Sequence, residues 1–322
     1  MYKAGEVILS ELDAAAQELR LHGPSLGLNN IVLLRDRIWR AANRYFPVRL
    51  FRYRPPHLCE LEALRHGAVY LSRIRDFDDG HDTFPLLDDE RISSIIDMQC
   101  TKDNFKAMVG QVDQSSELSN QDNGETARRV AAVVDDDASF DAFLDSFKNV
   151  VLQTIHSRSE QWRKDMRCAC FTEIEGSNYM WEYYAAQEKG FCAEYSVDNG
   201  ALRCVCDGWK TCDESLLTSL LPVRYDGRAV VDQLSYILAG YHDGLPFPSG
   251  EEHLLKLLIT SHKEKEFQQE HEWRLVAESC ERVRAACYVY LKPMRITAGK
   301  RCDAHFREEL KRTCDYIGVE MA

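Results

Sequence analysis

The sequence predicts an α+β protein with a twisted, mostly antiparallel central sheet, inserted helices and a helical extension at its N-terminus. Three observations predict this class. A strand, a short helix and a second strand follow one another within residues 49–72. Residues 88–165 are polar and mostly helical in pattern, and from residue 167 onward short apolar strands alternate with helices. Strands and helices in this arrangement are typical of an α+β chain.

The length, composition and net charge of the chain limit the classes of protein to which it can belong. A chain of 322 residues is long enough to bury a large core. Its hydrophobic fraction of 45% and charged fraction of 29% are typical of a soluble globular protein. The 52 acidic and 40 basic side chains give a net charge of -12. This net negative charge excludes a generic nucleic-acid binder, because phosphate contacts need concentrated lysine and arginine. It does not exclude a local basic groove.

The sequence predicts neither a membrane-spanning segment nor a secretory signal. No apolar run approaches the roughly 20 residues that cross a bilayer, and the N-terminus carries early acidic residues unlike a signal peptide. We therefore expect a cytoplasmic protein without membrane partners, whose 12 cysteines are reduced thiols. Cys204, Cys206 and Cys212 lie close together, but their spacing is not one of the strong zinc patterns, so metal binding there stays open.

The N-terminal part reads as two amphipathic helices, residues 2–22 and 28–45, separated by a Gly-Pro-Ser break. They are expected to form an extension over residues 1–48. The rest, 49–322, is expected to be one α+β domain with a mostly helical insertion at about 83–165.

The first strand of that domain places apolar side chains between three arginines, Arg49, Arg52 and Arg54. A helix at 57–66 follows and ends at Gly67. In chain order the remaining expected elements are a strand at 68–72, a flexible loop at 113–125, a helix at 139–163, a strand at 167–172, a helix at 178–189 closed by Gly190, strands at 191–197 and 221–225, helices at 229–240 and 251–266, strands at 286–291 and 295–298, a helix at 303–313 and a strand at 316–320.

An acidic loop at 75–82 holds Asp76, Asp78, Asp79, His81 and Asp82. Carboxylates are the ligands that hard cations prefer. These residue types are also common turn formers, and a solvated loop is the favoured interpretation.

The segment at 270–276, Glu-His-Glu-Trp-Arg-Leu-Val, lies where a charged helix gives way to an apolar strand. If the strand begins at Glu270, then Glu270, Glu272 and Arg274 share one face and Trp273 points to the other. Two like charges and one opposite charge on one face shift pKa values and bind polar ligands. The alternative is a strand edge where Arg274 simply pairs with a glutamate.

Seven motifs in order resemble one family. They are FRYRPP before a helix, the strand ending YLS, the FDDGHD loop, CFTE, MWEYYA followed by KGFCAEY, PVRY and EHEWRL. Together they resemble domain-of-unknown-function family 2971 (DUF2971), a bacterial and phage-associated family, over about residues 49–320. The departures are Gly80 and His81, where the family pattern prefers Pro and Phe.

The layout also has a more distant likeness to ADP-ribosyltransferase-like folds, in which an early strand carries arginine and a late strand carries Glu-x-Glu. That likeness implies NAD as substrate without a metal, because transfer of ADP-ribose needs a carboxylate beside an oxocarbenium-like ribose. It implies Glu272 as the catalytic carboxylate and Glu270 as the group that activates the acceptor. The residues it implies for NAD binding are Arg52, Arg54, Tyr70, Ser72, Thr172, Trp181, Tyr184 and Arg274.

The resemblance thus implies a bacterial NAD-dependent ADP-ribosyltransferase, a toxin or anti-phage defence effector with an unidentified acceptor and an antitoxin or defence-system partner. Two alternatives stay open. One is a non-enzymatic ligand-sensing or interaction module. The other is a metal-dependent nuclease that uses Asp78, Asp79, Asp82 and Glu272. Ordinary structural roles also stay open, with Trp181 and Tyr184 in the core and Ser72 and Thr172 as turn caps.

Overall fold

The structure is a computed structural model, and the chain divides into two compact units. The first contains Met1–Pro85, Gln161–Ala229 and Phe247–Ala322, and the second contains Leu86–Glu160 and Val230–Pro246. The structure describes residues 3–22, 33, 37, 40, 41, 44, 47–77, 89–106, 132–196, 203–206, 210–215, 220–227, 260–278 and 288–322.

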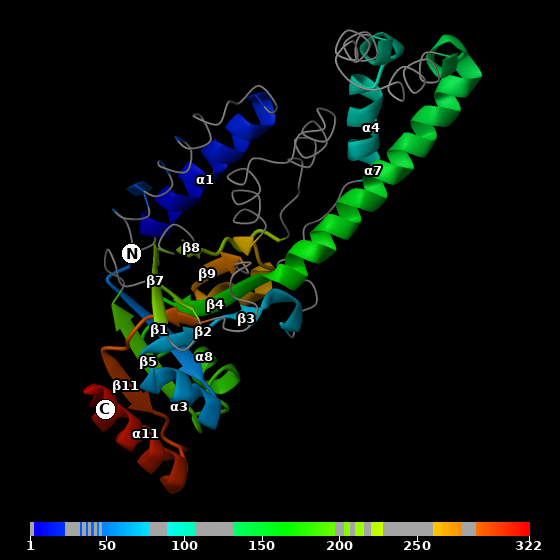
Figure 1. Cartoon of the computed structure of the whole chain (residues 1–322). Coiled ribbons are helices and arrows are strands. Elements are labelled where there is room, and N and C mark those ends of the chain that lie inside the picture. The colour runs from blue at the N-terminus through cyan, green and yellow to red at the C-terminus, as the bar shows by residue number, and fades with distance from the viewer. Residues whose placement is uncertain are drawn as a thin grey trace. The chain divides into compact units, whose positions relative to one another are not determined.

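The first unit is built on a large open sheet (Figure 1). Its strand order is β12-β11-β5-β1-β4-β9-β8, and β3 also pairs with β4. All of these pairs are antiparallel except β11 with β12. The strands are β1 (Arg49–Arg54), β3 (Ser72–Arg73), β4 (Met166–Thr172), β5 (Phe191–Ser196), β8 (Leu220–Pro222), β9 (Glu272–Glu278), β11 (Arg295–Ala298) and β12 (Glu320–Met321). The predicted α+β class with a mostly antiparallel sheet is confirmed.

A second, smaller sheet has the order β2-β10-β6-β7, whereas the sequence predicted a single sheet. Its strands are β2 (Ala68–Tyr70), β10 (Tyr288–Tyr290), β6 (Arg203–Cys206) and β7 (Lys210–Ser215). The strand expected at 68–72 is interrupted at the buried Leu71, so that β2 joins β10 while β3 joins β4. The pair β6 and β7 was not predicted, because its sequences, RCVC and KTCDES, lack the alternation typical of a half-buried strand.

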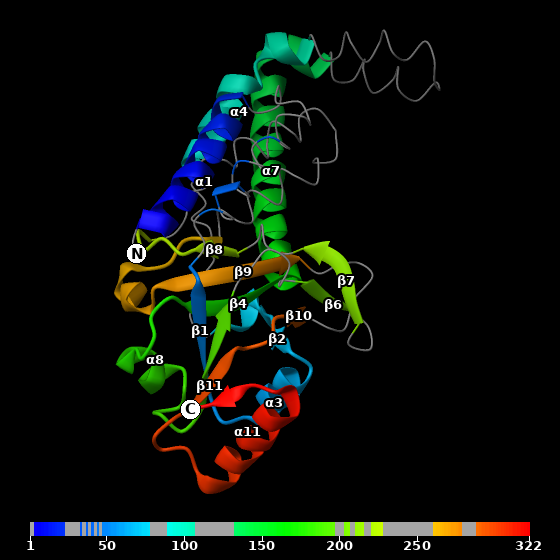
Figure 2. The same ribbon diagram turned by 90° about the vertical axis from the view of Figure 1, so that its left-hand side faces the viewer.

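Two helices lie side by side at one end of the large sheet, α3 (Leu58–Arg65) and α11 (Ala304–Ile317), as Figures 1 and 2 both show. Asp303 caps α11 by accepting a hydrogen bond of 2.9 Å from the amide of Phe306. Gly318 ends it with a φ of 65°. The helix therefore continues through residues 316 and 317, which were expected in the last strand.

The helix α8 (Asn178–Tyr183) is shorter than the expected helix at 178–189. Ser177 caps its start, and the chain then enters a left-handed turn at Ala186, Gln187 and Glu188, whose φ angles are 50°, 59° and 63°. Consecutive left-handed residues other than glycine are uncommon, and nothing in their side chains signals the change. The turn brings Gly190 so close to β1 that a Cβ there would lie 1.9 Å from the carbonyl oxygen of Arg54.

The helix α1 (Lys3–His22) packs its apolar face inward through Ile8, Leu12 and Ala15. It contacts β8, where a Cβ on Gly5 would lie 3.3 Å from Pro222. The helices expected at 28–45, 229–240 and 251–266, the loop at 113–125 and the acidic loop from Asp78 onward lie wholly or mostly outside the described residues.

The second unit contains α4 (Asp89–Gln99) and most of α7 (Asp137–Asp165), the helix expected at 139–163. Four aromatic rings pack together in this unit, with centroid distances between 5.3 and 6.4 Å: Phe105, Phe140, Phe143 and Phe147. An ion pair of 2.5 Å joins Lys148 of α7 to Asp97 of α4.

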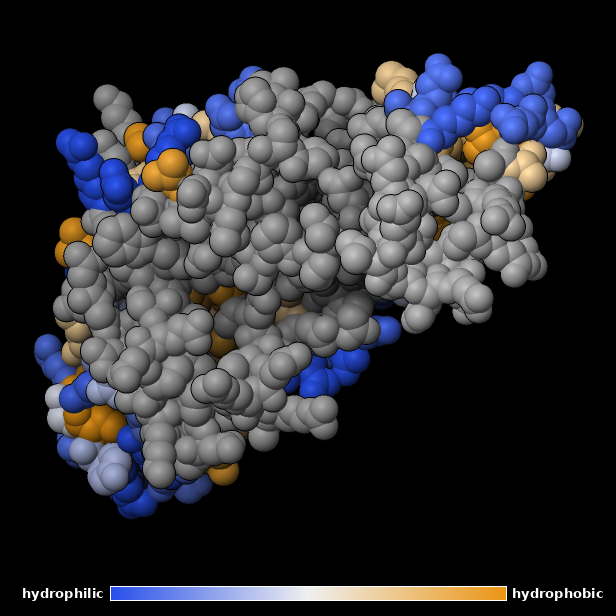
Figure 3. All heavy atoms as spheres, turned by 45° about the horizontal axis from the view of Figure 1, so that its top comes forward, coloured by the Kyte–Doolittle hydropathy of each residue, from blue (hydrophilic) through white to orange (hydrophobic). Residues whose placement is uncertain are grey.

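No helix among the described residues is long and apolar enough to cross a membrane. On the face drawn in Figure 3, hydrophilic residues lie beside smaller hydrophobic areas in the described part of the surface.

Candidate functional site

A cavity of about 750 Å³ lies in the first unit, within the size range of ligand sites. It is lined by segments far apart in the sequence: β1, the β2–β3 segment, β4, α8 and the segment that leads into β9. Seven of the ten predicted site residues line it, namely Arg52, Arg54, Tyr70, Ser72, Tyr184, Glu270 and Glu272.

Three predicted residues lie outside the lining of this cavity. Thr172 is fully buried, and its hydroxyl accepts a hydrogen bond of 3.1 Å from the amide of Ile174, so it caps a turn. Trp181 packs edge-on against Tyr53, with ring centroids 5.1 Å apart. Arg274 is buried behind Glu272. The structure therefore gives Thr172 and Trp181 structural contacts, and it gives Arg274 a role through Glu272.

Glu270 and Glu272 reach the same cavity by a route different from the expected one. Glu270 ends the 3₁₀ helix η6 (Lys265–Glu270), and β9 begins only at Glu272. Between them His271 adopts a left-handed conformation with a φ of 44°. The carboxylates therefore converge through this turn and not through the alternation of one strand.

Arg274 and Lys263 hold Glu272 as an anion. The Nε of Arg274 donates to Oε1 at 2.7 Å and Nη2 donates to Oε2 at 3.2 Å, while Lys263 Nζ lies 3.1 Å from Oε2. Burial alone would raise the pKa of Glu272, but the charges of Arg274 and Lys263 outweigh it and hold that pKa well below its usual range. Glu272 is therefore a fixed negative charge at neutral pH.

Glu270 has the opposite electrostatic character. Tyr184 donates its hydroxyl to Oε1 at 2.6 Å, and Lys263 Nζ donates to Oε2 at 2.6 Å. Burial, together with the negative charge of Glu272, nevertheless raises the pKa of Glu270 to about 7. This carboxyl group can therefore take up and release a proton near neutral pH, which is a property of acid–base groups in active sites.

Sequence reasoning missed Lys263, the cation that joins the two carboxylates. Its side chain is buried, and its Nζ also lies 4.7 Å from the ring centroid of Phe267. In the sequence, the segment HKEKEF at 262–267 has the charged pattern typical of the exposed end of a helix. No local signal distinguishes this lysine from Lys265, which is exposed two residues later.

The β1 side of the cavity is positively charged. Arg52 is buried and donates to the carbonyl oxygen of Tyr70 at 3.0 Å. Arg54 pairs through Nη2 with Glu60, but its Nε is buried without a hydrogen-bond partner among the described residues. Arg73 also lines the cavity and has no ion pair with another described residue. The guanidinium groups of Arg52, Arg54 and Arg73 all line the cavity, which makes this wall suitable for an anion.

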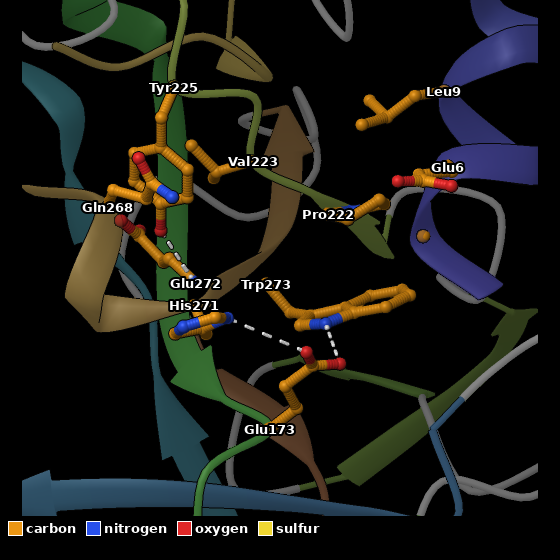
Figure 4. Close-up of a pocket in the computed structure, with 11 residues that line it drawn as sticks. Glu6, Leu9, Glu173, Pro222, Val223, Tyr225, Gln268, His271, Glu272 and Trp273 are labelled. Carbon is orange, nitrogen blue, oxygen red and sulfur yellow. Dashed lines mark hydrogen bonds and ion pairs between the residues drawn. The ribbon is translucent and has the colours of Figure 1, made fainter. Parts of the chain in front are cut away.

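A second cavity of about 280 Å³ lies beside Trp273 (Figure 4). Its lining includes Tyr225, whose hydroxyl accepts a hydrogen bond of 2.7 Å from the amide of Glu272. Trp273 donates its indole N–H to Glu173 at 3.4 Å, and the same carboxylate lies 3.8 Å from His271 Nδ1. These contacts fix the backbone on both sides of Glu272.

Metal-ligating residues do not cluster in the described part of the chain, where no group of three or more His, Cys, Asp or Glu is placed to hold an ion. The side chains of Cys204, Cys206 and Cys212 and the residues Asp78, Asp79 and Asp82 lie outside it. The described cysteines, Cys59, Cys100, Cys168, Cys170, Cys192, Cys302 and Cys314, are free thiols.

Residues 180–275 match a family described as protein of unknown function (DUF2971). The matched stretch begins with Met180 and Trp181 and includes Tyr184, Lys263 and both carboxylates of the cavity. The resemblance to DUF2971 is thus confirmed over this stretch, which is shorter than the expected range of 49–320. No curated protein and no solved structure matches the chain.

Proposed function

We propose that this chain is an NAD-dependent ADP-ribosyltransferase-like enzyme whose reaction takes place in the large cavity. One observation carries the proposal. The cavity brings a positively charged wall from β1 and a buried pair of carboxylates from the η6–β9 segment to one space lined by aromatic rings. A dinucleotide offers matching chemistry, because its diphosphate suits guanidinium groups and its ribose develops positive charge during transfer.

The residues of the cavity fit NAD as a substrate. The partly exposed guanidinium of Arg54 and that of Arg73, which has no ion pair with another described residue, suit the two phosphate groups. Tyr70 is about one-third exposed and offers an aromatic face to a ring of the dinucleotide. We therefore assign the diphosphate to the arginine wall and the nicotinamide ribose to the carboxylates.

The reaction would break the bond between C1′ of the ribose and the nicotinamide nitrogen, and nicotinamide would leave with the bonding electrons. The acceptor would form the new bond at C1′ and lose a proton. In this proposal Glu272 stabilises the positive ribose as a fixed anion, and Glu270 receives the proton of the acceptor. The biological setting that we propose, a bacterial toxin or anti-phage effector, follows from the resemblance stated above.

A second candidate is a ligand-sensing module without turnover. It is favoured by the internal satisfaction of both carboxylates: each oxygen of Glu270 and of Glu272 already has a hydrogen-bond donor. Such a network also rigidifies a binding site. A metal-dependent nuclease centred on these two carboxylates is less favoured, because Lys263 Nζ lies between them where a cation would bind.

The test is NAD consumption, together with label transfer from adenylate-labelled NAD in bacterial lysate. Wild type is compared with Glu270→Gln, Glu272→Gln and the exposed control Glu308→Gln on α11. The proposal expects nicotinamide release and labelled product with wild type and the control only, with no effect of chelator. NAD binding without consumption would favour the sensing module, and chelator-sensitive cleavage of nucleic acid would favour the nuclease. Neither binding nor consumption by folded protein would overturn the proposal.

A further inference from the structure

The hydrogen-bonded network around Glu270 and Glu272 includes one side chain that is partly exposed, the phenol of Tyr184. The chain of contacts runs from Arg274 through Glu272 and Lys263 to Glu270, and each of these side chains is at least nine-tenths buried. It ends at Tyr184, whose hydroxyl donates to Glu270 Oε1 at 2.6 Å. Tyr184 is 36% exposed and lines the cavity. A ligand that enters the cavity therefore meets this phenol more readily than the carboxylate behind it.

The backbone holds Tyr184 in one place. It follows the last residue of α8, and its amide and that of Ala185 both bond the carbonyl oxygen of Met180, at 3.0 and 3.2 Å. Ala185 is fully buried, and its carbonyl oxygen accepts a hydrogen bond of 2.9 Å from Gly190. The left-handed turn that follows thus anchors the residue on both sides. A group positioned in this way is preorganised for a directional proton transfer.

We infer that Tyr184 is a catalytic residue that relays the acceptor's proton to Glu270. The inference rests on the proposed function and specifies its acid–base step. As the nucleophilic atom of the acceptor forms its bond to C1′ and nicotinamide leaves, the acceptor's proton passes to the phenol oxygen of Tyr184. The phenol's own proton passes to Oε1 of Glu270. Both residues return to their starting state when Glu270 releases that proton to solvent.

The electrostatics of the pair agree with this relay. Burial raises the pKa of the Tyr184 phenol well above its ordinary value, so Tyr184 stays protonated between turnovers. Glu270, in contrast, exchanges its proton near neutral pH. A neutral phenol that gains one proton while it gives up another never becomes a phenolate. The titratable groups that face Glu270 are Glu272 and Lys263, with the phenols of Tyr179, Tyr184 and Tyr225.

Azide distinguishes a proton relay by Tyr184 from a structural role of that residue. As an anionic nucleophile it has no proton to lose, so its attack on C1′ needs no general base. The experiment measures nicotinamide release from NAD by wild type, Tyr184→Phe, Glu270→Gln and Tyr183→Phe, with water as acceptor and then with added azide. Tyr183 is the last residue of α8, directly before Tyr184, and is 69% exposed, which makes it a matched control. Wild type and Tyr183→Phe are expected to be equally active with water.

With water, Tyr184→Phe and Glu270→Gln are each expected to be slower by about 100-fold to 10,000-fold, the usual contribution of general-base catalysis. Azide should restore both, and the double variant should be no slower than either single one. A Tyr184→Phe protein as active as wild type would overturn the relay and leave the proposed function intact. A slow variant that azide does not restore would show a structural role instead. Absence of NAD consumption by wild type would overturn the proposed function and the relay with it.

Discussion

Lys263 Nζ lies 2.6 Å from Oε2 of Glu270, and both side chains are buried. The same ammonium group lies 3.1 Å from Glu272, so a single cation serves two carboxylates. Removing that cation would leave buried Glu270 without a cationic partner and Glu272 with Arg274 alone. Lys263 therefore offsets much of the cost of burying Glu270, and it shares with Arg274 the compensation of Glu272.

Lys263→Met is the first prediction that follows. Removing one partner of a buried ion pair costs about 3–5 kcal/mol of unfolding free energy, because the remaining charge stays buried without compensation. Urea unfolding at pH 7 measures this loss, and Lys265→Met, at an exposed position, should change little. Adding Glu270→Gln to Lys263→Met removes one of the two carboxylates and should recover part of the loss. If Lys263→Met lowered the unfolding free energy by less than about 1 kcal/mol, the ion pair between Lys263 and Glu270 would be solvated and not buried.

The pH dependence of stability provides a second prediction. The folded state raises the pKa of Glu270 to about 7, above the ordinary value of 4.5. The folded protein therefore binds more protons than the unfolded chain between these values, and the contribution of Glu270 to stability falls as the pH rises through that window. Unfolding free energies of wild type and Glu270→Gln should be compared from pH 4 to 8. The difference should change between about pH 4.5 and 7 and level off above it, and a flat difference would contradict the shift.

How far the sequence predicts this site depends on the range of the interaction involved. The apolar residues between Arg49, Arg52 and Arg54 predict the position of β1 correctly, because the preference for a strand lies in the residues of the strand itself. The left-handed His271 and the burial of Lys263 are different in kind. Both depend on partners brought close by other segments, as Glu173 is to His271, and such contacts leave no mark in the local sequence.

Gly190→Ala tests the close approach of β1 to the turn after α8. A Cβ at this position would lie 1.9 Å from the carbonyl oxygen of Arg54, which is backbone and cannot move aside cheaply. We expect a loss of about 3 kcal/mol or more, at the upper end of the cost of overpacking. Gly176→Ala is the contrasting variant, since its φ is 72° but no atom lies within 4 Å, and it should cost about 1–2 kcal/mol. Thermal unfolding of the two variants should rank them in that order, and the reverse order would contradict the packing described above.

Arg54 offers the most direct test of the anion wall. Burial raises the pKa of Glu60, but the hydrogen bond from Arg54 outweighs it and lowers that pKa, so an ionised Glu60 competes with any ligand for Arg54. Arg54→Leu should weaken the binding of ADP-ribose by about 10-fold to 100-fold, the value of a hydrogen bond to a charged group. Glu60→Gln should strengthen it, because the guanidinium loses its internal partner. Calorimetry with ADP-ribose and with inorganic pyrophosphate measures both changes, and Arg65→Leu on α3 is the control outside the cavity. Equal affinities for all four proteins would place the anion elsewhere, whereas opposite shifts for Arg54→Leu and Glu60→Gln would assign it to this wall.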